Sequence, residues 1–235
     1  MALPKLNSSP SYETVVPSTG QKILFRPFLV KEQKNLLIAM ETQDRKDLVR
    51  AIIDTIQACS ITDIEGELTT FDVDYLFTMI RAKSVGESSD VSMSCTECGT
   101  DNTVKVQIDT VELSSDIKDA FIPITEQIKV KMKYPTYEEF LGNEKLFSST
   151  SFTESLLELI IVCMDSILTE EERFSIKDES KEEVINFIES MTSEQFEKIA
   201  EFVTDIPAVS QTGKFKCSGC GKENDYILKG MDDFF

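Results

Sequence analysis

Four of the six cysteines in this 235-residue chain are arranged as two short motifs of the form C-x-x-C-G. One motif begins at Cys95 and the other at Cys217, and each lies between two runs typical of β-strands. Two cysteines separated by two residues can place both thiolates on one metal ion, and the glycine that follows can adopt the positive φ that such a turn needs. The pattern predicts one structural Zn²⁺ per chain, held by Cys95, Cys98, Cys217 and Cys220.

The two motifs are far apart in the sequence. Residues 99–216 separate them, whereas a compact two-knuckle zinc site has roughly 15–20 residues between its pairs. The fold must therefore bring two distant hairpins together. Four free cysteines in a reducing cytosol are the simpler alternative. A thiol redox protein is a further one, although neither pair opens a helix after a strand, where a thiol would be acidified. Cys59 and Cys163 lie in apolar helical runs and are expected to pack in the core.

Several classes of catalytic site are excluded by composition. The chain contains no histidine, which removes Ser-His-Asp and Cys-His catalysis and histidine-bound catalytic zinc. A zinc ion closed by four cysteines has no position open for water. No Gly-rich phosphate loop is present, and the 42 acidic residues fall on the polar faces of expected helices. We therefore predict that the protein is not an enzyme.

The formal net charge of −18 argues against a general nucleic-acid binder, which needs a basic face. A zinc-ribbon protein that binds nucleic acid, for example in transcription, remains the alternative. Its basic patch would have to come from Lys214, Lys216 and Lys222 beside the second motif. No apolar run is long enough to span a membrane, and the first residues do not resemble a signal peptide. A reducing cytoplasm is the expected compartment.

Helices and strands that must position the cysteines can be read from the hydrophobic periodicity. A hairpin is predicted over residues 12–26, and the segment before it reads as an extended arm. Three helices should follow, beginning near Val30, Asp44 and Thr69, the last with Asp72 in its first turn. Residues 127–133 alternate as a strand with one face in water, while 117–125 should be irregular. Further helices are expected from Thr136, over 151–168, from Ser180 and from Ser193 up to Pro207.

Together these elements predict an α+β protein that is mainly helical, with an N-terminal β-hairpin and a split four-cysteine zinc ribbon. The expected domains are 1–87, the arm, hairpin and helices; 88–110 with 210–230, the ribbon; 111–209, an inserted strand and helical lobe; and 231–235, a C-terminal tail.

The N-terminal sequence resembles a known family. The residues concerned are Met1-Ala-Leu-Pro-Lys-Leu-Asn, then Tyr12-Glu, then Pro17-Ser-Thr-Gly-Gln-Lys-Ile-Leu-Phe-Arg-Pro-Phe-Leu-Val-Lys-Glu-Gln-Lys-Asn-Leu-Leu37. This stretch is similar to the start of the baseplate hub and hub-assembly proteins of T-even-type contractile-tailed bacteriophages. The resemblance implies a structural role through binding to other baseplate proteins. It also implies a location in the host cytoplasm during assembly or in the tail baseplate of the virion. A homo-oligomer is left open.

Six residues are candidates for contact with such partners. Tyr12, Phe25, Arg26 and Phe28 belong to the predicted hairpin and its exit, and Phe234 and Phe235 end the chain. The two terminal aromatic residues could dock on a partner or fold back onto their own domain, and the sequence favours neither.

Overall fold

The computed structural model describes residues 10–143 and 151–234. They divide into two compact units: the described residues up to Ser114 together with those from Ala208 onward, and the unit Ser115–Pro207. Helices contain 39% of the described residues and strands contain 26%. The chain therefore mixes helices with small antiparallel sheets, and the expectation of a mainly helical protein is not confirmed. No helix within the described ranges is long and apolar enough to cross a bilayer.

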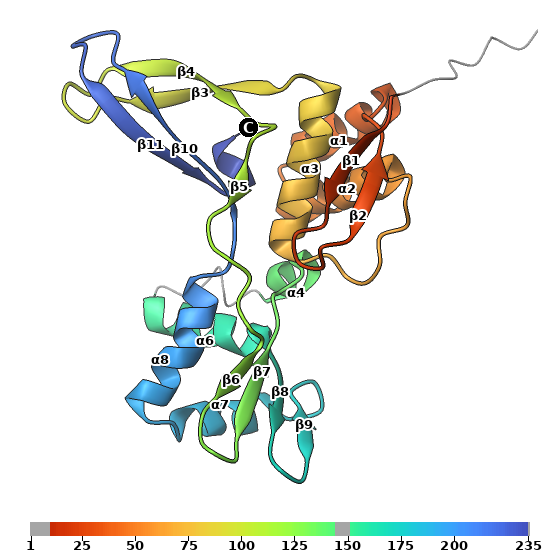
Figure 1. Ribbon diagram of the computed structural model, residues 1–235, viewed down its shortest axis with the longest axis vertical. Coiled ribbons are helices and arrows are strands. Elements are labelled where there is room, and N and C mark those ends of the chain that lie inside the picture. The colour runs from red at the N-terminus through yellow and green to blue at the C-terminus, as the bar shows by residue number, and fades with distance from the viewer. Residues whose placement is uncertain (1–9, 144–150, 235) are drawn as a thin grey trace, which may run out of the picture. The chain divides into compact units, whose positions relative to one another are not determined.

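The first unit begins with an antiparallel hairpin, β1 (Tyr12–Val15) and β2 (Lys22–Phe25), followed by helices α1 (Val30–Thr42), α2 (Arg45–Cys59) and α3 (Thr70–Ser84) (Figure 1). The side chain of Asp44 caps α2. Thr69, which was predicted to lie at the start of α3, forms a capping box with Asp72. Apolar side chains from the hairpin and these helices are buried: Ile23, Phe25, Ile52, Ile56, Leu76 and Ile80. The hydrophobic faces predicted for α2 and α3 thus form core.

Two longer hairpins complete this unit. The first is β3 (Ser88–Ser94) with β4 (Asp101–Gln107), and the second is β10 (Val209–Lys216) with β11 (Glu223–Lys229). The short β5 (Glu112–Leu113) joins the second sheet in the order β11-β10-β5. The 3-10 helix η1 (Met231–Asp233) follows. A core cluster joins α3, both hairpins and the C-terminal segment: Ala82, Val106, Ile108, Val111, Val209, Leu228 and Phe234.

The second unit contains a four-stranded antiparallel sheet in the order β6-β7-β8-β9. Its strands are β6 (Phe121–Pro123), β7 (Lys129–Met132), β8 (Met164–Leu168) and β9 (Arg173–Ser175). Its described helices are α4 (Tyr137–Gly142), α6 (Phe152–Cys163), α7 (Lys181–Glu189) and α8 (Ser193–Thr204). Residues of the strands and of α6, α7 and α8 form one core, which includes Val130, Met132, Ile160, Val184, Ile199 and Phe202.

Two expectations for this second unit are wrong. The helix predicted over 151–168 ends at Cys163, and Met164–Leu168 is a strand. The stretch predicted to be irregular contains β6. In each case pairing with β7 decides the conformation, since Met164 pairs with Met132, and Ile122 with Val130. Tertiary pairing overrides local propensity here.

Candidate metal centre

The two C-x-x-C-G motifs form the turns of the hairpins β3–β4 and β10–β11, and their backbones follow the same course. The N–H of Cys95 donates to the carbonyl oxygen of Thr100 at 2.9 Å, and that of Cys217 to Lys222 at 2.8 Å. The glycines at the ends of the motifs, Gly99 and Gly221, have φ of 70° and 78°, a conformation that L side chains rarely adopt. The two hairpins therefore present their cysteines in equivalent turns, which we call the knuckles.

The fold brings all four predicted cysteines together. Their Sγ atoms lie within 4.8 Å of one another, with 3.7 Å between Cys95 and Cys220 and 3.6 Å between Cys98 and Cys217. Four thiolates at about 2.3 Å from a tetrahedral zinc ion are separated by about 3.8 Å, whereas sulfurs in a disulfide are about 2.05 Å apart. The spacing therefore suits a shared metal ion, and these four cysteines are free thiols.

Hydrogen bonds favour the thiolate form of the first cysteine in each motif, Cys95 and Cys217. Backbone N–H groups of Cys98 and Glu97 lower the pKa of Cys95 to about 6, and the N–H of Cys220 lowers that of Cys217. The N–H of Lys222 also favours the thiolate of Cys220, but hydrogen bonds to the other sulfurs and burial raise its pKa to about 12. A cation bound by the four sulfurs would favour the thiolate form, so its binding would release protons.

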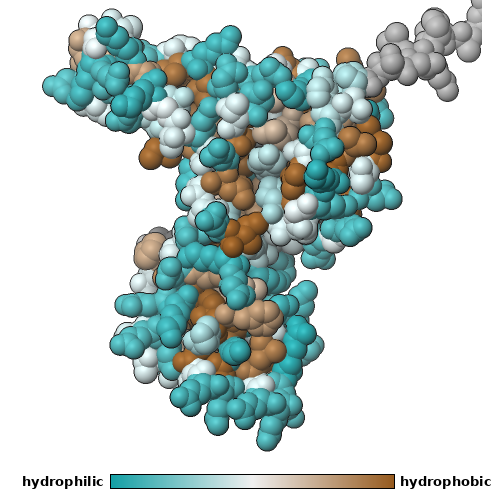
Figure 2. Space-filling model, viewed as in Figure 1, coloured by the Kyte–Doolittle hydropathy of each residue, from teal (hydrophilic) through white to brown (hydrophobic). Residues whose placement is uncertain are grey.

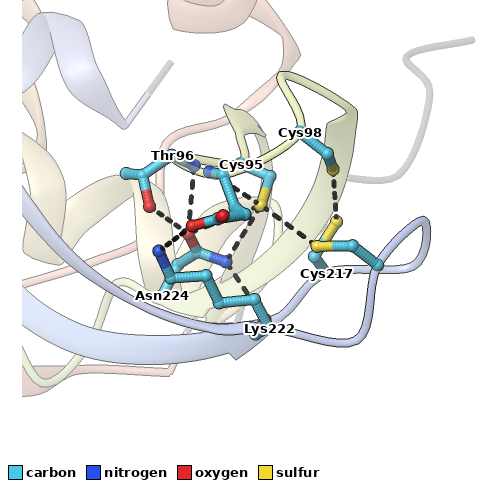
Figure 3. A network of polar contacts seen from close by, with 8 residues as sticks. Cys95, Thr96, Cys98, Cys217, Lys222 and Asn224 are labelled. Atoms are coloured by element: carbon cyan, nitrogen blue, oxygen red, sulfur yellow. Dashed lines mark hydrogen bonds and ion pairs between the residues drawn. The ribbon is translucent and has the colours of Figure 1, made fainter.

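Sequence reasoning missed two polar residues of this cluster, Asn102 and Asn224. Both are buried, and their side-chain NH₂ groups lie against Cys217 and Cys95, respectively. Figure 3 shows Asn224 between Thr96, Cys95 and Lys222. A signal was present in the sequence: residues 95–102 and 217–224 both read C-x-x-C-G-x-[D/E]-N. Comparing the knuckles beyond their glycines would have identified the pair.

The lysines proposed for a basic patch have acidic neighbours. Lys214 lies 3.3 Å from carboxylates of Glu223 and of Asp225. Lys222 pairs at 2.8 Å with Glu97 of the other knuckle, which adds a contact across the cluster. Two of the three positive charges are thus offset locally, which does not favour a phosphate-binding surface.

Most of the six candidate partner-binding residues make contacts within the chain. Phe25 is only 2% exposed, and its ring centroid lies 5.8 Å from that of Tyr12. Arg26 donates to the carbonyl oxygens of Pro27 and Ala58 and to the carboxylate of Glu32. Phe28 is half-buried, and its N–H donates to Ser84. The side chain of Phe25 therefore belongs to the core, and its prediction as a surface contact is wrong.

The C-terminal tail folds back. Phe234 is fully buried in the cluster that joins α3 and the two hairpins, and its carbonyl oxygen accepts a hydrogen bond from the Ser89 hydroxyl at 2.8 Å. Of the two alternatives for this residue, the structure supports folding back, and a docking role for its side chain is wrong. Phe235 lies outside the described residues.

Exposed apolar side chains occur elsewhere in the first unit. Four of them, each at least half exposed, lie on α1: Val30, Leu37, Ile38 and Met40. Hydrophobic side chains also gather on the visible face over β1, β2 and the helices beside them (Figure 2), where Val15 and Leu24 are partly exposed. This surface of α1 was not among the candidate contact sites predicted from the sequence.

Comparison with known proteins supports the N-terminal resemblance and extends it. The family model of the T4 bacteriophage base plate protein matches residues 9–235. The baseplate hub assembly protein gp26 of Enterobacteria phage T4 is 25% identical over 219 residues, which are 92% of this chain and 94% of that protein. No solved structure matches. The similarity covers both hairpins that carry the cysteines, and the chain belongs to the T4 bacteriophage base plate protein family.

Proposed function

We propose that the protein is a non-enzymatic factor in phage tail morphogenesis, acting as a subunit or assembly factor of the baseplate hub by binding other baseplate proteins. The observation that carries the proposal is the family match over residues 9–235. It is supported by the similarity to a protein named as a baseplate hub assembly protein, which extends over 94% of that protein. The protein would act in the host cytoplasm during assembly and in the tail baseplate.

The second part of the proposal is one structural Zn²⁺ per chain, held by Cys95, Cys98, Cys217 and Cys220. The distances between their sulfurs support it. When bound, the ion would supply a link between two hairpins that are more than a hundred residues apart in the sequence, and it would have no position open for a substrate. Because such a site is assembled by the fold, the free energy of metal binding would contribute to folding.

We place the contact with the hub partner on the outward face of α1. This face carries the four exposed apolar side chains described above together with the exposed Lys34, whereas Lys31 is paired with Glu32 at 3.3 Å. In a chain with a net charge of −18, an apolar patch that includes a lysine is suited to an apolar surface bearing a carboxylate. The occupant we propose is such a surface on another baseplate protein.

The test is growth of the phage that encodes this chain, with the gene replaced by variants. Leu37→Glu and Ile38→Glu alter the α1 face, and Ile227→Glu is the matched control because Ile227 is a 72% exposed apolar residue on β11 of the same unit. We expect all three proteins to melt at similar temperatures. The α1 variants should yield few complete baseplates by electron microscopy, whereas the control should yield normal numbers.

Two results would contradict different parts of the proposal. Normal baseplates from both α1 variants would show that the contact surface is misplaced. Normal baseplates from a phage that lacks the whole gene would show that the protein is not needed for hub assembly. The zinc is tested separately by metal content.

A further inference from the structure

Asn102 and Asn224 occupy the same position in the two knuckles, four residues after the second cysteine. They are 7% and 3% exposed, although most of their neighbours on β4 and β11 are at least partly exposed. A buried amide must find hydrogen-bond partners to offset its loss of water. The hydrogen-bond partners of these two side chains lie in the opposite knuckle as well as in their own.

Asn224 reaches from the second knuckle into the first. Its Oδ1 accepts hydrogen bonds from the N–H of Thr96 at 3.1 Å and from the Thr96 hydroxyl at 2.8 Å. Its Nδ2 donates to the carbonyl oxygen of Lys222 in its own knuckle at 3.1 Å and to Sγ of Cys95 at 3.5 Å. The amide therefore uses two acceptor and two donor positions, which is its full capacity (Figure 3).

Asn102 makes the reciprocal set of bonds. Its Oδ1 accepts from the N–H and the hydroxyl of Ser218 at 2.8 and 2.9 Å. Its Nδ2 donates to the carbonyl oxygen of Thr100 in its own knuckle at 2.8 Å and lies 3.7 Å from Sγ of Cys217. Each asparagine thus holds its own turn and grips the residue that follows the first cysteine of the opposite turn.

The sulfurs that the asparagines face are the two buried ones, Cys95 and Cys217. Each also receives a backbone N–H, from Glu97 at 3.5 Å and from Gly219 at 3.3 Å. The asparagine adds an N–H dipole directed at the sulfur from the other hairpin. Such a contact stabilises a thiolate and fixes its direction, as outer-shell groups do at metal sites.

We propose that Asn102 and Asn224 are positioning residues of the metal site, which clamp the two knuckles together and set the affinity for a tetrahedral, thiolate-preferring divalent cation such as Zn²⁺. The effect on affinity rests on the proposed zinc site, whereas the clamp itself needs only the hydrogen bonds described above. Neither asparagine is proposed as a ligand of the ion. Both donate toward sulfur atoms, and the four cysteines remain the proposed ligands.

The test compares Asn102→Asp and Asn224→Asp with Asn35→Asp, an exposed position on α1 with the same change of charge. Aspartate keeps both acceptor bonds but turns an oxygen, in place of the NH₂ group, toward the sulfur and the carbonyl oxygen. Zn²⁺ affinity is measured by competition with a chromophoric chelator. We expect a loss of roughly 10–100-fold for each site variant, of similar size in both because the bonds are reciprocal, and no change for the control.

A second pair of variants guards against misfolding. Asn102→Ser and Asn224→Ser shorten the side chain without adding charge, and they should also weaken zinc binding. In all folded variants the Co²⁺-substituted protein should keep the thiolate-to-cobalt charge-transfer band of a four-sulfur site. A residue with a merely structural role would lower the melting temperature but leave the affinity of the folded protein unchanged. Unchanged affinity in both aspartate and both serine variants would overturn the inference.

Failure of the zinc proposal can be told apart from failure of the clamp. If the natural protein binds neither Zn²⁺ nor Co²⁺, the zinc proposal is wrong, and the clamp is judged on the reduced protein by labelling with a thiol reagent. Labelling is done at a pH high enough to ionise the thiols, so that the rate reports access to the sulfur rather than its pKa. The clamp predicts that Cys95 and Cys217 react faster in the two serine variants than in the natural protein. Equal rates would overturn the clamp as well.

Discussion

Replacing Cys217 by alanine should release the zinc ion and with it the link between the two cysteine hairpins. The link closes a long loop, since Cys98 and Cys217 are 119 positions apart. Because the site is assembled by the fold, the ion binds the folded chain and is released on unfolding, so the free energy of metal binding adds to the stability of the folded state. The size of the effect depends on the concentration of free Zn²⁺ relative to the dissociation constant of the site.

With free Zn²⁺ at 100 times the dissociation constant, binding contributes about 2.7 kcal/mol, and at 1,000 times the dissociation constant it contributes about 4.1 kcal/mol. Under these conditions, loss of zinc should therefore lower the free energy of unfolding by about 3–4 kcal/mol.

The assay is urea unfolding of the natural protein and of Cys217→Ala, each with added Zn²⁺ and with a strong chelator. Cys59→Ala is the matched control, because Cys59 is a buried thiol of the same unit outside the cluster. The natural protein and the control should both respond to the chelator, and Cys217→Ala should not. If the chelator removes the metal from the natural protein and stability does not change, the structural role of the ion is refuted.

Three further predictions concern single contacts. Gly219→Ala should cost about 1–3 kcal/mol by chemical denaturation, because a Cβ there would lie 2.7 Å from Oγ1 of Thr100; adding Thr100→Ala should recover part of the loss, and equal stability of the single variant would contradict the close approach. Phe234→Ala should cost about 3–5 kcal/mol in the same assay, since the ring is fully buried; an unchanged midpoint would favour a docking tail. Burial of Glu32 would raise its pKa, but hydrogen bonds from Arg26 and the backbone outweigh burial and lower the pKa below 4.5. The ionised side chain therefore contributes to stability above about pH 4.5, and this contribution is lost as the pH falls further. Glu32→Gln should lower the free energy of unfolding at neutral pH by about 1–3 kcal/mol and flatten this part of the pH profile, whereas a profile identical to that of the natural protein would contradict the ion pair.

The convergence of the four cysteines could be predicted because the chemistry of the pair is local. A C-x-x-C-G turn between two strands has few uses, and two copies suggest a shared ion whatever the distance between them. The asparagines were missed because a single asparagine in a strand carries no such signal. Only their equal spacing from Cys98 and Cys220 distinguishes them.

The predictions from sequence were wrong where contacts between distant parts of the chain determine the secondary structure or the burial of a side chain. Residues 151–168 read as one apolar helix, yet Met164–Leu168 pairs between β7 and β9, and no glycine or proline marks the change. Phe25 was predicted as a surface contact, and the two roles of Phe234, docking and folding back, were left open, because aromatic residues near a turn or a chain end can serve either role. Burial of both rings depends on partners far away in the sequence, which periodicity does not reveal.

The most direct measurement is the mass of the purified protein under native and denaturing conditions, for the natural chain and for one cysteine variant from each hairpin, Cys95→Ala and Cys217→Ala. A split site predicts one zinc ion on the natural chain under native conditions and none on either variant, because the ligands come from both hairpins. Zinc retained by one variant, no metal on the natural chain, or a mass lowered by the two hydrogens of a disulfide would contradict it.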